Sequence, residues 1–224
     1  MKPPVKFGFI LLVCFLLCAC AKDRVPVVFQ DYTPPPVKSD GHAFAFAPDV
    51  QDKRVRNDRW NQVIAAEKAA PSFEGHVLHM PDEQLAADWR ALYDFVIDAD
   101  MPAKLRYVNS FFNKFPFKDD DENWGGPHWA APREFLTKGG GDCEDYAIAK
   151  YYALKALGVP FGDMFITVVG YPDKAGMHAV LVVLDGADYY VLDNLKKDAV
   201  YLNSTDKAFY VRQYYNENLS RSQD

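Results

Sequence analysis

The residues best suited to chemistry in this chain surround Cys143, which follows three glycines at the start of a predicted helix. Residues 139–146 read Gly-Gly-Gly-Asp-Cys-Glu-Asp-Tyr, and Cys143 is the only cysteine beyond the first twenty residues. A thiol in the first turn of a helix lies at the positive end of the helix dipole, which favours the nucleophilic thiolate. The pattern therefore predicts a catalytic cysteine, with a buried structural cysteine as the alternative.

A histidine and a carboxylate follow in the order that a cysteine nucleophile needs. His178 is the candidate that takes and returns the proton, and Asp193 is the candidate that orients the imidazole. Residues 177–184 and 189–193 are rich in β-branched and aromatic residues and flank an Asp-Gly turn signal. We therefore expect both side chains to lie on one β-hairpin.

The register of this hairpin decides whether the two side chains meet. If residues 185 and 188 face each other, Asp193 lies opposite Val180, which shares a face with His178. Asp193 is then the diagonal same-face neighbour of His178, within reach of an imidazole–carboxylate hydrogen bond. A slip of one residue would send Asp193 to the opposite face.

The elements that position these residues follow from the apolar pattern. Leu85, Trp89, Leu92 and Val96 form one helical stripe, and Leu105, Val108, Phe112 and Phe115 form a second one between Pro102 and Pro116. The cysteine helix is predicted over 142–157, with the thiol facing inward. The predicted sheet strands are 164–170, 177–184, 189–193, 199–202 and 208–215. The fold class is therefore α+β, with helices first and an antiparallel sheet after them.

Carboxylates crowd the thiol. Asp142, Glu144 and Asp145 place up to three negative charges within one helical turn of Cys143, and like charge raises the pKa of a thiol. A bound hard cation would offset them, and oxygen-rich clusters suit Ca2+. Ordinary helix-start chemistry, with Asp142 as N-cap, is the alternative.

Five short motifs together resemble one protein family. They are Gly139–Ala147, His178–Leu181, Leu192–Asn194, Val108–Asn113 and Trp129–Leu136. These motifs resemble the bacterial transglutaminase-like cysteine peptidases, specifically the LapG-type periplasmic proteases, over about residues 45–216. The resemblance implies a papain/transglutaminase-like fold in which N-terminal helices pack on a C-terminal antiparallel β-sheet. It also implies a catalytic triad of Cys143, His178 and Asp193, and calcium held by Asp142 and Glu144.

The resemblance further implies a biological role. LapG-type proteases cut the N-terminal region of a large surface adhesin and so release cells from a biofilm. An inner-membrane cyclic-di-GMP receptor of LapD type sequesters the protease. For this chain we therefore expect a large adhesin as substrate and such a receptor as partner.

Two other classes of function stay open. The same triad order serves transglutaminases, which pass the acyl group to an amine in place of water. A non-catalytic lipoprotein binding module that keeps the fold is the other alternative, although Cys143, His178 and Asp193 are all intact.

The N-terminus predicts export. Lys2 and Lys6 precede a 13-residue apolar run that is too short to span a bilayer, so residues 1–19 read as a signal peptide. The run ends in Leu-Cys-Ala-Cys, which resembles a bacterial lipobox and predicts lipidation of Cys20; ordinary cleavage after Ala21 is the alternative. Residues 20–44 contain three consecutive prolines and are predicted to form a flexible tether. Residues 45–224 are predicted to form the peptidase domain. The expected location is the periplasm, anchored to the outer membrane.

Composition agrees with a single secreted domain. A chain of 224 residues that is 49% hydrophobic can bury a substantial core. Loss of residues 1–19 leaves 23 basic against 31 acidic residues, a net charge near −8 that argues against nucleic-acid binding. The charged run 118–123 predicts a solvated loop, and no Cys-x-x-Cys or His-Glu-x-x-His zinc pattern is present.

Overall fold

The computed structural model describes residues 57–70, 72, 73, 77, 82–170, 175–186, 188–195, 200–202 and 210–221. The predicted signal peptide, Cys20 and the tether 20–44 lie outside the described residues. The helices are α1 (Asp58–Ala69), α3 (Glu83–Val96), α4 (Met101–Phe112), α5 (Asp120–Trp124), α6 (Pro132–Lys138), α7 (Cys143–Ala156), the 3-10 turn η3 (Phe161–Asp163) and α8 (Glu217–Arg221). None of the described helices has the length and apolar character needed to cross a membrane.

The strands form one antiparallel sheet in the order β4-β3-β2-β1-β5. They are β1 (Met164–Gly170), β2 (Met177–Asp185), β3 (Asp188–Leu192), β4 (Val200–Leu202) and β5 (Tyr210–Tyr215). Each begins and ends within two residues of its predicted range, and β2 and β3 form the predicted hairpin. The last strand, β5, pairs with β1, which is the first strand after the N-terminal helices.

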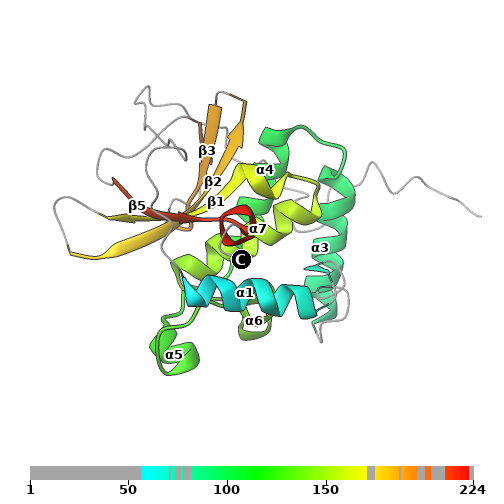
Figure 1. Cartoon of the computed structure of the whole chain (residues 1–224). Coiled ribbons are helices and arrows are strands. Elements are labelled where there is room, and N and C mark those ends of the chain that lie inside the picture. The colour runs from blue at the N-terminus through cyan, green and yellow to red at the C-terminus, as the bar shows by residue number, and fades with distance from the viewer. Residues whose placement is uncertain are drawn as a thin grey trace, which may run out of the picture.

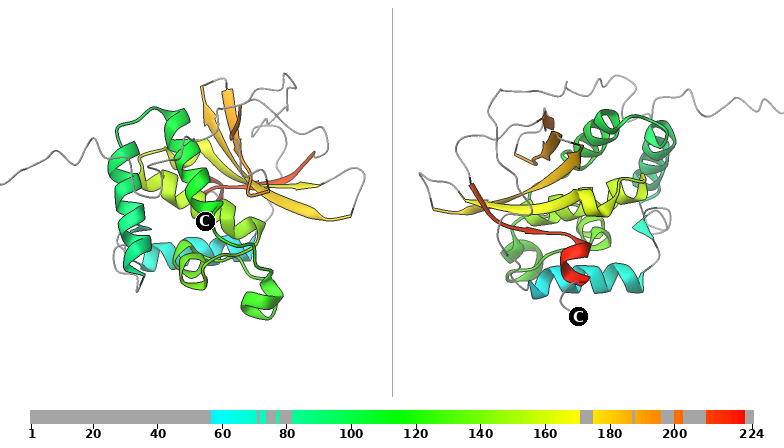
Figure 2. Two further views of the ribbon diagram at one scale, coloured as in Figure 1. Left: turned by 180° about the vertical axis from the view of Figure 1, so that it is seen from behind. Right: turned by 45° about the horizontal axis from the view of Figure 1, so that its top comes forward.

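The helices and the sheet form two layers, with the sheet lying against the helical half of the molecule (Figure 1). Two further views show the same separation of the helices from the sheet (Figure 2). Helix α7 contacts β2 and β1, and α4 packs against both α7 and β4. Large side chains fill the space between the elements, including Trp60, Trp89, Phe112, Phe135 and Tyr151, all nearly inaccessible to solvent. The predicted α+β layout is therefore confirmed.

The predicted helical stripes are core faces. Trp89, Leu92 and Val96 of α3 are buried, and Leu85 packs partly buried against them. Helix α4 begins where the Asp100 carboxylate caps the N–H of Ala103, and ends at Phe112, before the proline at 116. Helix α7 covers the predicted range, with residues 142 and 157 as its caps.

The structure corrects the prediction made for the charged run 118–123. It was predicted to be a solvated loop, but residues 120–124 form helix α5. Three acidic residues fill the first turn and complement the helix dipole, and Gly125 ends the helix in the left-handed conformation. This short helix places Asp120 close to α7.

Candidate active site

The glycine loop before α7 is packed so closely that side chains would not fit. Gly140 has a φ of 137°, and a Cβ there would lie 2.2 Å from the carbonyl oxygen of Pro116. At Gly141 a Cβ would lie 2.3 Å from Oδ2 of Asp145. Because both positions are glycine, the loop packs closely against residues 116–118, and Cys143 lies in the first turn of α7.

The Cys143 thiol lies between an acidic neighbour and the sheet. Its Sγ donates a hydrogen bond to Oε2 of Glu144 over 2.8 Å. The backbone N–H of Ala179 in β2 also hydrogen-bonds to the sulfur, which favours the thiolate. Burial, followed by the charge of Glu144, nevertheless raises the pKa of the thiol above its ordinary value. The thiol thus faces the sheet as predicted, beside the residue that follows His178.

His178 and Asp193 form a buried hydrogen-bonded pair. Nε2 of His178 lies 2.8 Å from Oδ1 of Asp193, and the two residues are 5% and 4% exposed. The hairpin register that brings them together is the predicted one, because Asp185 pairs with Asp188 and every later pair follows from it. The prediction that these two side chains share a face is confirmed.

The environment of Asp193 keeps it ionised. Burial alone would raise the pKa of this carboxyl, but the hydrogen bond and the charge of His178 bring the pKa below its usual value. The N–H of Leu195 donates a further hydrogen bond of 2.9 Å to the same oxygen. An ionised Asp193 accepts the Nε2 proton, so Nδ1 is the imidazole nitrogen left to take a proton.

Among the described residues, the hydrogen bonds of the Cys143 sulfur go to Glu144 and Ala179, not to His178. Catalytic hydrogen bonds are often long or misaligned without substrate and tighten in the complex. The structure therefore brings His178 and Asp193 together and sets Cys143 beside them. The catalytic roles of the three residues remain predictions.

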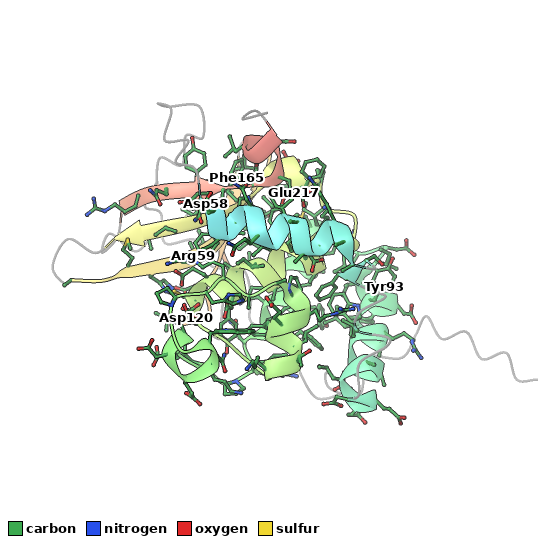
Figure 3. The ribbon with its side chains drawn as sticks, turned by 60° about the horizontal axis from the view of Figure 1, so that its bottom comes forward. Asp58, Arg59, Tyr93, Asp120, Phe165 and Glu217 are labelled. Atoms are coloured by element: carbon green, nitrogen blue, oxygen red, sulfur yellow. The ribbon has the colours of Figure 1, made fainter. Side chains whose placement is uncertain are left out.

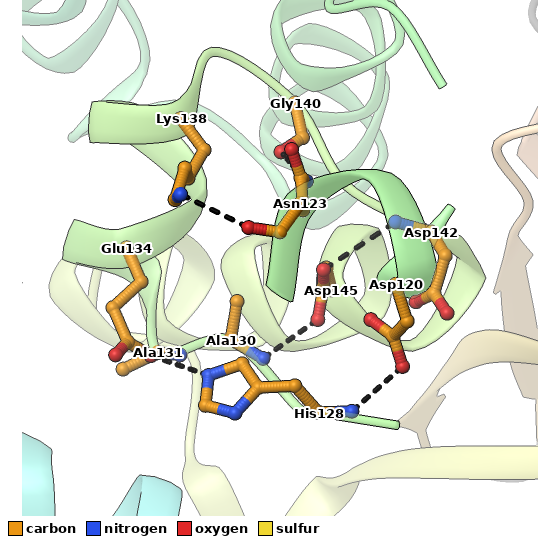
Figure 4. Close-up of polar contacts among 10 residues, drawn as sticks. All are labelled: Asp120, Asn123, His128, Ala130, Ala131, Glu134, Lys138, Gly140, Asp142 and Asp145. Atoms are coloured by element: carbon orange, nitrogen blue, oxygen red, sulfur yellow. Dashed lines mark hydrogen bonds and ion pairs between the residues drawn. The ribbon is translucent and has the colours of Figure 1, made fainter. Parts of the chain in front are cut away.

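Three carboxylates from two helices meet at the start of α7. Oxygens of Asp120, Asp142 and Asp145 lie within 4.8 Å of one another (Figure 4). The ligand atoms of Asp142, Cys143 and Glu144 form a second, overlapping group. Asp145 is fully buried and accepts the N–H groups of Ala130, at 2.7 Å, and Asp142, at 3.4 Å. These bonds fix its carboxylate against the glycine loop.

The remaining oxygens of this cluster fit a cation better than capping. Oδ1 of Asp142 and Oδ1 of Asp120 are buried and have no hydrogen-bond partner among the described residues. Asp142 is the N-cap of α7 and forms a capping box with Asp145, so capping accounts for part of this cluster and leaves these two oxygens unpaired. Burial raises the pKa of Asp142 to about 8 and that of Asp145 to about 7. An all-oxygen set of this kind suits a hard divalent cation, which favours the ionised carboxylates.

Sequence reasoning missed two residues near the site. Asp120 was assigned to a solvated loop, and no local signal in the sequence shows that α5 brings it to the start of α7. Lys150 is the second: it is 0% exposed, and its Nζ has no hydrogen-bond partner among the described residues. Burial lowers the pKa of Lys150 to about 7, while the charge of Asp193 opposes this shift. The position of this lysine among apolar residues of the cysteine helix was the sequence signal that it is buried.

The fold and the site define a transglutaminase-like cysteine proteinase. The family model described as "Bacterial transglutaminase-like cysteine proteinase BTLCP" (Peptidase_C93) matches residues 81–221, well over half of the chain. The chain belongs to this family, and the match spans Cys143, His178 and Asp193.

Solved structures of Legionella pneumophila LapG are similar to this chain. The calcium-bound form has 27% sequence identity and a TM-score of 0.53, over 70% of this chain and 83% of that one. A second LapG structure has the same identity and coverage with a TM-score of 0.50. The EGTA-treated form has 27% identity and a TM-score of 0.53, over 70% of this chain and 81% of that one. No curated protein sequence gives a significant match. The predicted LapG-type resemblance and the transglutaminase-like fold are confirmed.

Proposed function

We propose that this protein is a periplasmic, calcium-dependent cysteine endopeptidase that cleaves the N-terminal region of a large surface adhesin and so controls release from a biofilm. The observation that carries the proposal is the buried pair of His178 and Asp193, 2.8 Å apart, beside a cysteine at the start of α7. Membership of a cysteine proteinase family supports the hydrolytic chemistry. The similarity to LapG supports the substrate class.

In the proposed mechanism, the Cys143 sulfur attacks the carbonyl carbon of the scissile peptide bond. His178 takes the thiol proton at Nδ1 and returns it to the leaving amine as the C–N bond breaks. Asp193 holds the imidazole through Nε2 and stabilises its protonated form. The backbone N–H of Cys143 contributes to stabilising the oxyanion. Water, activated by the same imidazole, then hydrolyses the thioester and frees the enzyme.

We propose Asp142 and Glu144 as calcium ligands. Asp120 and Asp145 join them, because their oxygens lie within 4.8 Å of an oxygen of Asp142, whereas Glu144 belongs to the overlapping group of Asp142 and Cys143. The unpartnered oxygens of Asp120 and Asp142 support this assignment, as do the calcium-bound and EGTA-treated forms of LapG. When bound, Ca2+ supplies positive charge that offsets the carboxylates beside the Cys143 thiol.

The proposed location rests on the sequence of the N-terminus. We propose that residues 1–19 are removed, that Cys20 carries lipid and anchors the protein to the outer membrane, and that residues 20–44 let the domain stand off the membrane. An inner-membrane cyclic-di-GMP receptor of LapD type is the proposed regulatory partner. Cys20→Ala should move the protein from the membrane fraction to the soluble periplasm or block its processing. An unmodified mature N-terminus at Lys22, found by mass spectrometry, would refute lipidation.

The function is tested in cells that lack the gene. Complementation with the wild-type protein should shorten one large surface protein near its N-terminus and release it from the cells. Complementation with Cys143→Ala should leave that protein full-length and attached. Identical surface proteins in both strains would contradict the proposal. Crosslinked or amine-labelled product in place of cleaved product would instead indicate acyl transfer.

A further inference from the structure

Lys150 is a charged residue that the core of the molecule buries completely. Its side chain is inaccessible to solvent, and its Nζ has no hydrogen-bond partner among the described residues. An ammonium that leaves water without gaining such a partner is costly, and a methionine would fill the same space without that cost. Charged groups in surroundings of this kind are typical of functional sites.

Lys150 lies on the same face of α7 as Cys143. The two are seven residues apart, which is two helical turns and a rise of about 10 Å. The sulfur of Cys143 accepts the N–H of Ala179 in β2, so this face of α7 is turned toward the sheet. Nζ of Lys150 lies 5.7 Å from the ring centroid of Tyr146, one turn nearer to Cys143. The lysine side chain therefore runs back along α7 toward the proposed catalytic residues.

Two hydrogen bonds connect this part of α7 to Asp193. The hydroxyl of Tyr146 donates to the backbone carbonyl oxygen of Phe115 over 2.5 Å. Two residues earlier in the chain, Nδ2 of the buried Asn113 donates to the backbone carbonyl oxygen of Asp193 over 3.0 Å. The short segment that follows α4 thus joins the aromatic ring beside the Lys150 ammonium to Asp193.

Lys150 and Asp193 act on each other as charges. Burial lowers the pKa of Lys150 to about 7, and the charge of Asp193 opposes this shift. Burial raises the pKa of Asp193, whereas His178, the N–H of Leu195 and the charge of Lys150 lower it. The lysine is therefore charged below pH 7, which is the range in which an imidazole–carboxylate pair takes up a proton.

The groups that face Asp193 come from three elements. Strand β2 contributes His178, α7 contributes Lys150, and the end of α4 contributes the uncharged amide of Asn113. The charged side chains that Figure 3 labels on α1 and α5 are not among the charges that act on Asp193. The charge of Lys150 is therefore directed at the residue that orients the imidazole.

We propose that Lys150 is a positioning residue that acts through Asp193. Its buried ammonium holds Asp193 as a carboxylate, and this carboxylate holds His178 as a neutral base with its proton on Nε2. An added proton on the pair would place a second positive charge near the ammonium, in a region that water does not reach. The inference deepens the proposed function and rests on it only for the role of His178 as the base.

The charge coupling is tested without substrate. Nitrogen-15 NMR of the histidine rings reports the protonation of His178 at each pH, and His178→Gln assigns its signals. Lys150→Met keeps the length of the side chain and removes the charge, so the variant should fold. We expect the pH at which the pair takes up a proton to rise by about half to one unit in this variant. Lys68→Met, which removes an exposed ammonium from α1, is the matched control and should cause no shift.

A double substitution tests whether the effect passes through Asp193. In an Asp193→Asn background the carboxylate is absent, so Lys150→Met should shift the titration of His178 by less than about a third of its effect in the wild type. Lys150→Leu, a second uncharged variant, should reproduce the shift of Lys150→Met. No shift in either variant, or an equal shift in both backgrounds, would overturn the proposal.

Cleavage of surface proteins from cells that lack the gene supplies a second readout. At pH 5.5 Lys150→Met should cleave about three- to tenfold more slowly than the wild type. At pH 8 the wild-type lysine has lost most of its charge, so the two rates should agree within about twofold. An equal loss at both pH values would indicate a structural role and contradict the proposal. If the wild type cleaves nothing, the proposed function fails, while the NMR comparison still decides whether Lys150 acts on Asp193.

Discussion

Nε2 of His178 lies 2.8 Å from Oδ1 of Asp193, although fifteen residues separate the two in the chain. The hairpin between them places both side chains on one face of the sheet. Asp193 directly follows Leu192 of β3, which pairs with Leu181 of β2, and is the diagonal neighbour of His178. Burial of both residues removes competition from water and strengthens the bond. The imidazole is thereby held in one tautomer, with Nδ1 as its basic nitrogen.

Asp193→Asn should therefore cost activity rather than stability. The amide keeps the shape of the side chain but favours the wrong imidazole tautomer, so cleavage should slow by about a thousandfold or more. Cleavage rates and thermal melting of the same samples check this. Asp185→Asn, an exposed position in the turn of the same hairpin, is the matched control and should be active. A fully active Asp193→Asn protein would shift the orienting role to another residue, of which Asn194 is the nearest candidate.

Calcium binding should depend on Asp120 as well as on Asp142 and Glu144. Asp120→Asn removes one charged ligand with an unpartnered oxygen, so calcium affinity should fall by about ten- to a hundredfold. Asp121→Asn, the exposed neighbour on α5, should leave the affinity unchanged. Calcium titration calorimetry of both variants makes the comparison.

Chelation tests the same site in the intact enzyme. EGTA should stop cleavage, and Ca2+ should restore it better than Mg2+, which demands a stricter octahedral geometry. Full activity after exhaustive chelation would reject the calcium requirement.

Gly141→Ala should destabilise the fold through one contact. The added methyl group would lie 2.3 Å from Oδ2 of the buried Asp145, so the carboxylate or the loop has to shift. Overpacking of this kind typically costs about 1–3 kcal/mol. Denaturant unfolding should show this loss, and the calcium affinity should fall with it because Asp145 belongs to the acidic cluster. Wild-type stability would show that the loop is looser than its packing indicates.

Lys150 should give the protein a distinct pH dependence of stability. Its pKa is lowered to about 7 by burial, whereas in the unfolded chain it is about 10.4. The folded state therefore binds fewer protons between these values, and stability should rise with pH there by about 1 kcal/mol per pH unit. The destabilisation is fully present below pH 7 and disappears toward pH 10.

The variant Lys150→Met isolates this effect. Its stability should exceed that of the wild type most at pH 7 and below, with the difference shrinking as the pH rises. Because the charge of Lys150 also lowers the pKa of Asp193, the variant should lose activity at a higher pH than the wild type on acidification. Parallel stability curves for the two proteins would show that Lys150 does not titrate in this range.

The hairpin and the cysteine helix were predictable because local patterns determine them. An Asp-Gly turn between two β-branched runs allows few registers, and the burial of one face selects among them. The cysteine helix is bounded by strong signals, the glycines before residue 142 and Gly-Val-Pro after residue 157. The catalytic candidates lie on these two elements, which is why they were found from the sequence.

The residues that were missed depend on contacts between distant segments. Asp120 reaches the site only because α5 folds back against α7, and nothing in residues 118–123 encodes that approach. Lys150 is buried on a helix that packs against α4, α6 and the sheet, and helical periodicity alone does not reveal that packing. Helix α1 likewise meets a segment far away in sequence, because Nε1 of Trp60 donates a hydrogen bond to the backbone carbonyl oxygen of Asn216, 156 residues later.

The most direct test of the account is to incubate the purified protein and Cys143→Ala, each with Ca2+, with surface proteins from cells that lack the gene. Mass spectrometry of new protein N-termini then reports hydrolysis. We predict one new N-terminus, near the start of a single large surface protein, that needs both Ca2+ and Cys143, with less than about 1% of its yield in the variant. No new N-terminus in the wild-type sample, or the same one from Cys143→Ala, would contradict the assignment of this protein as a cysteine endopeptidase.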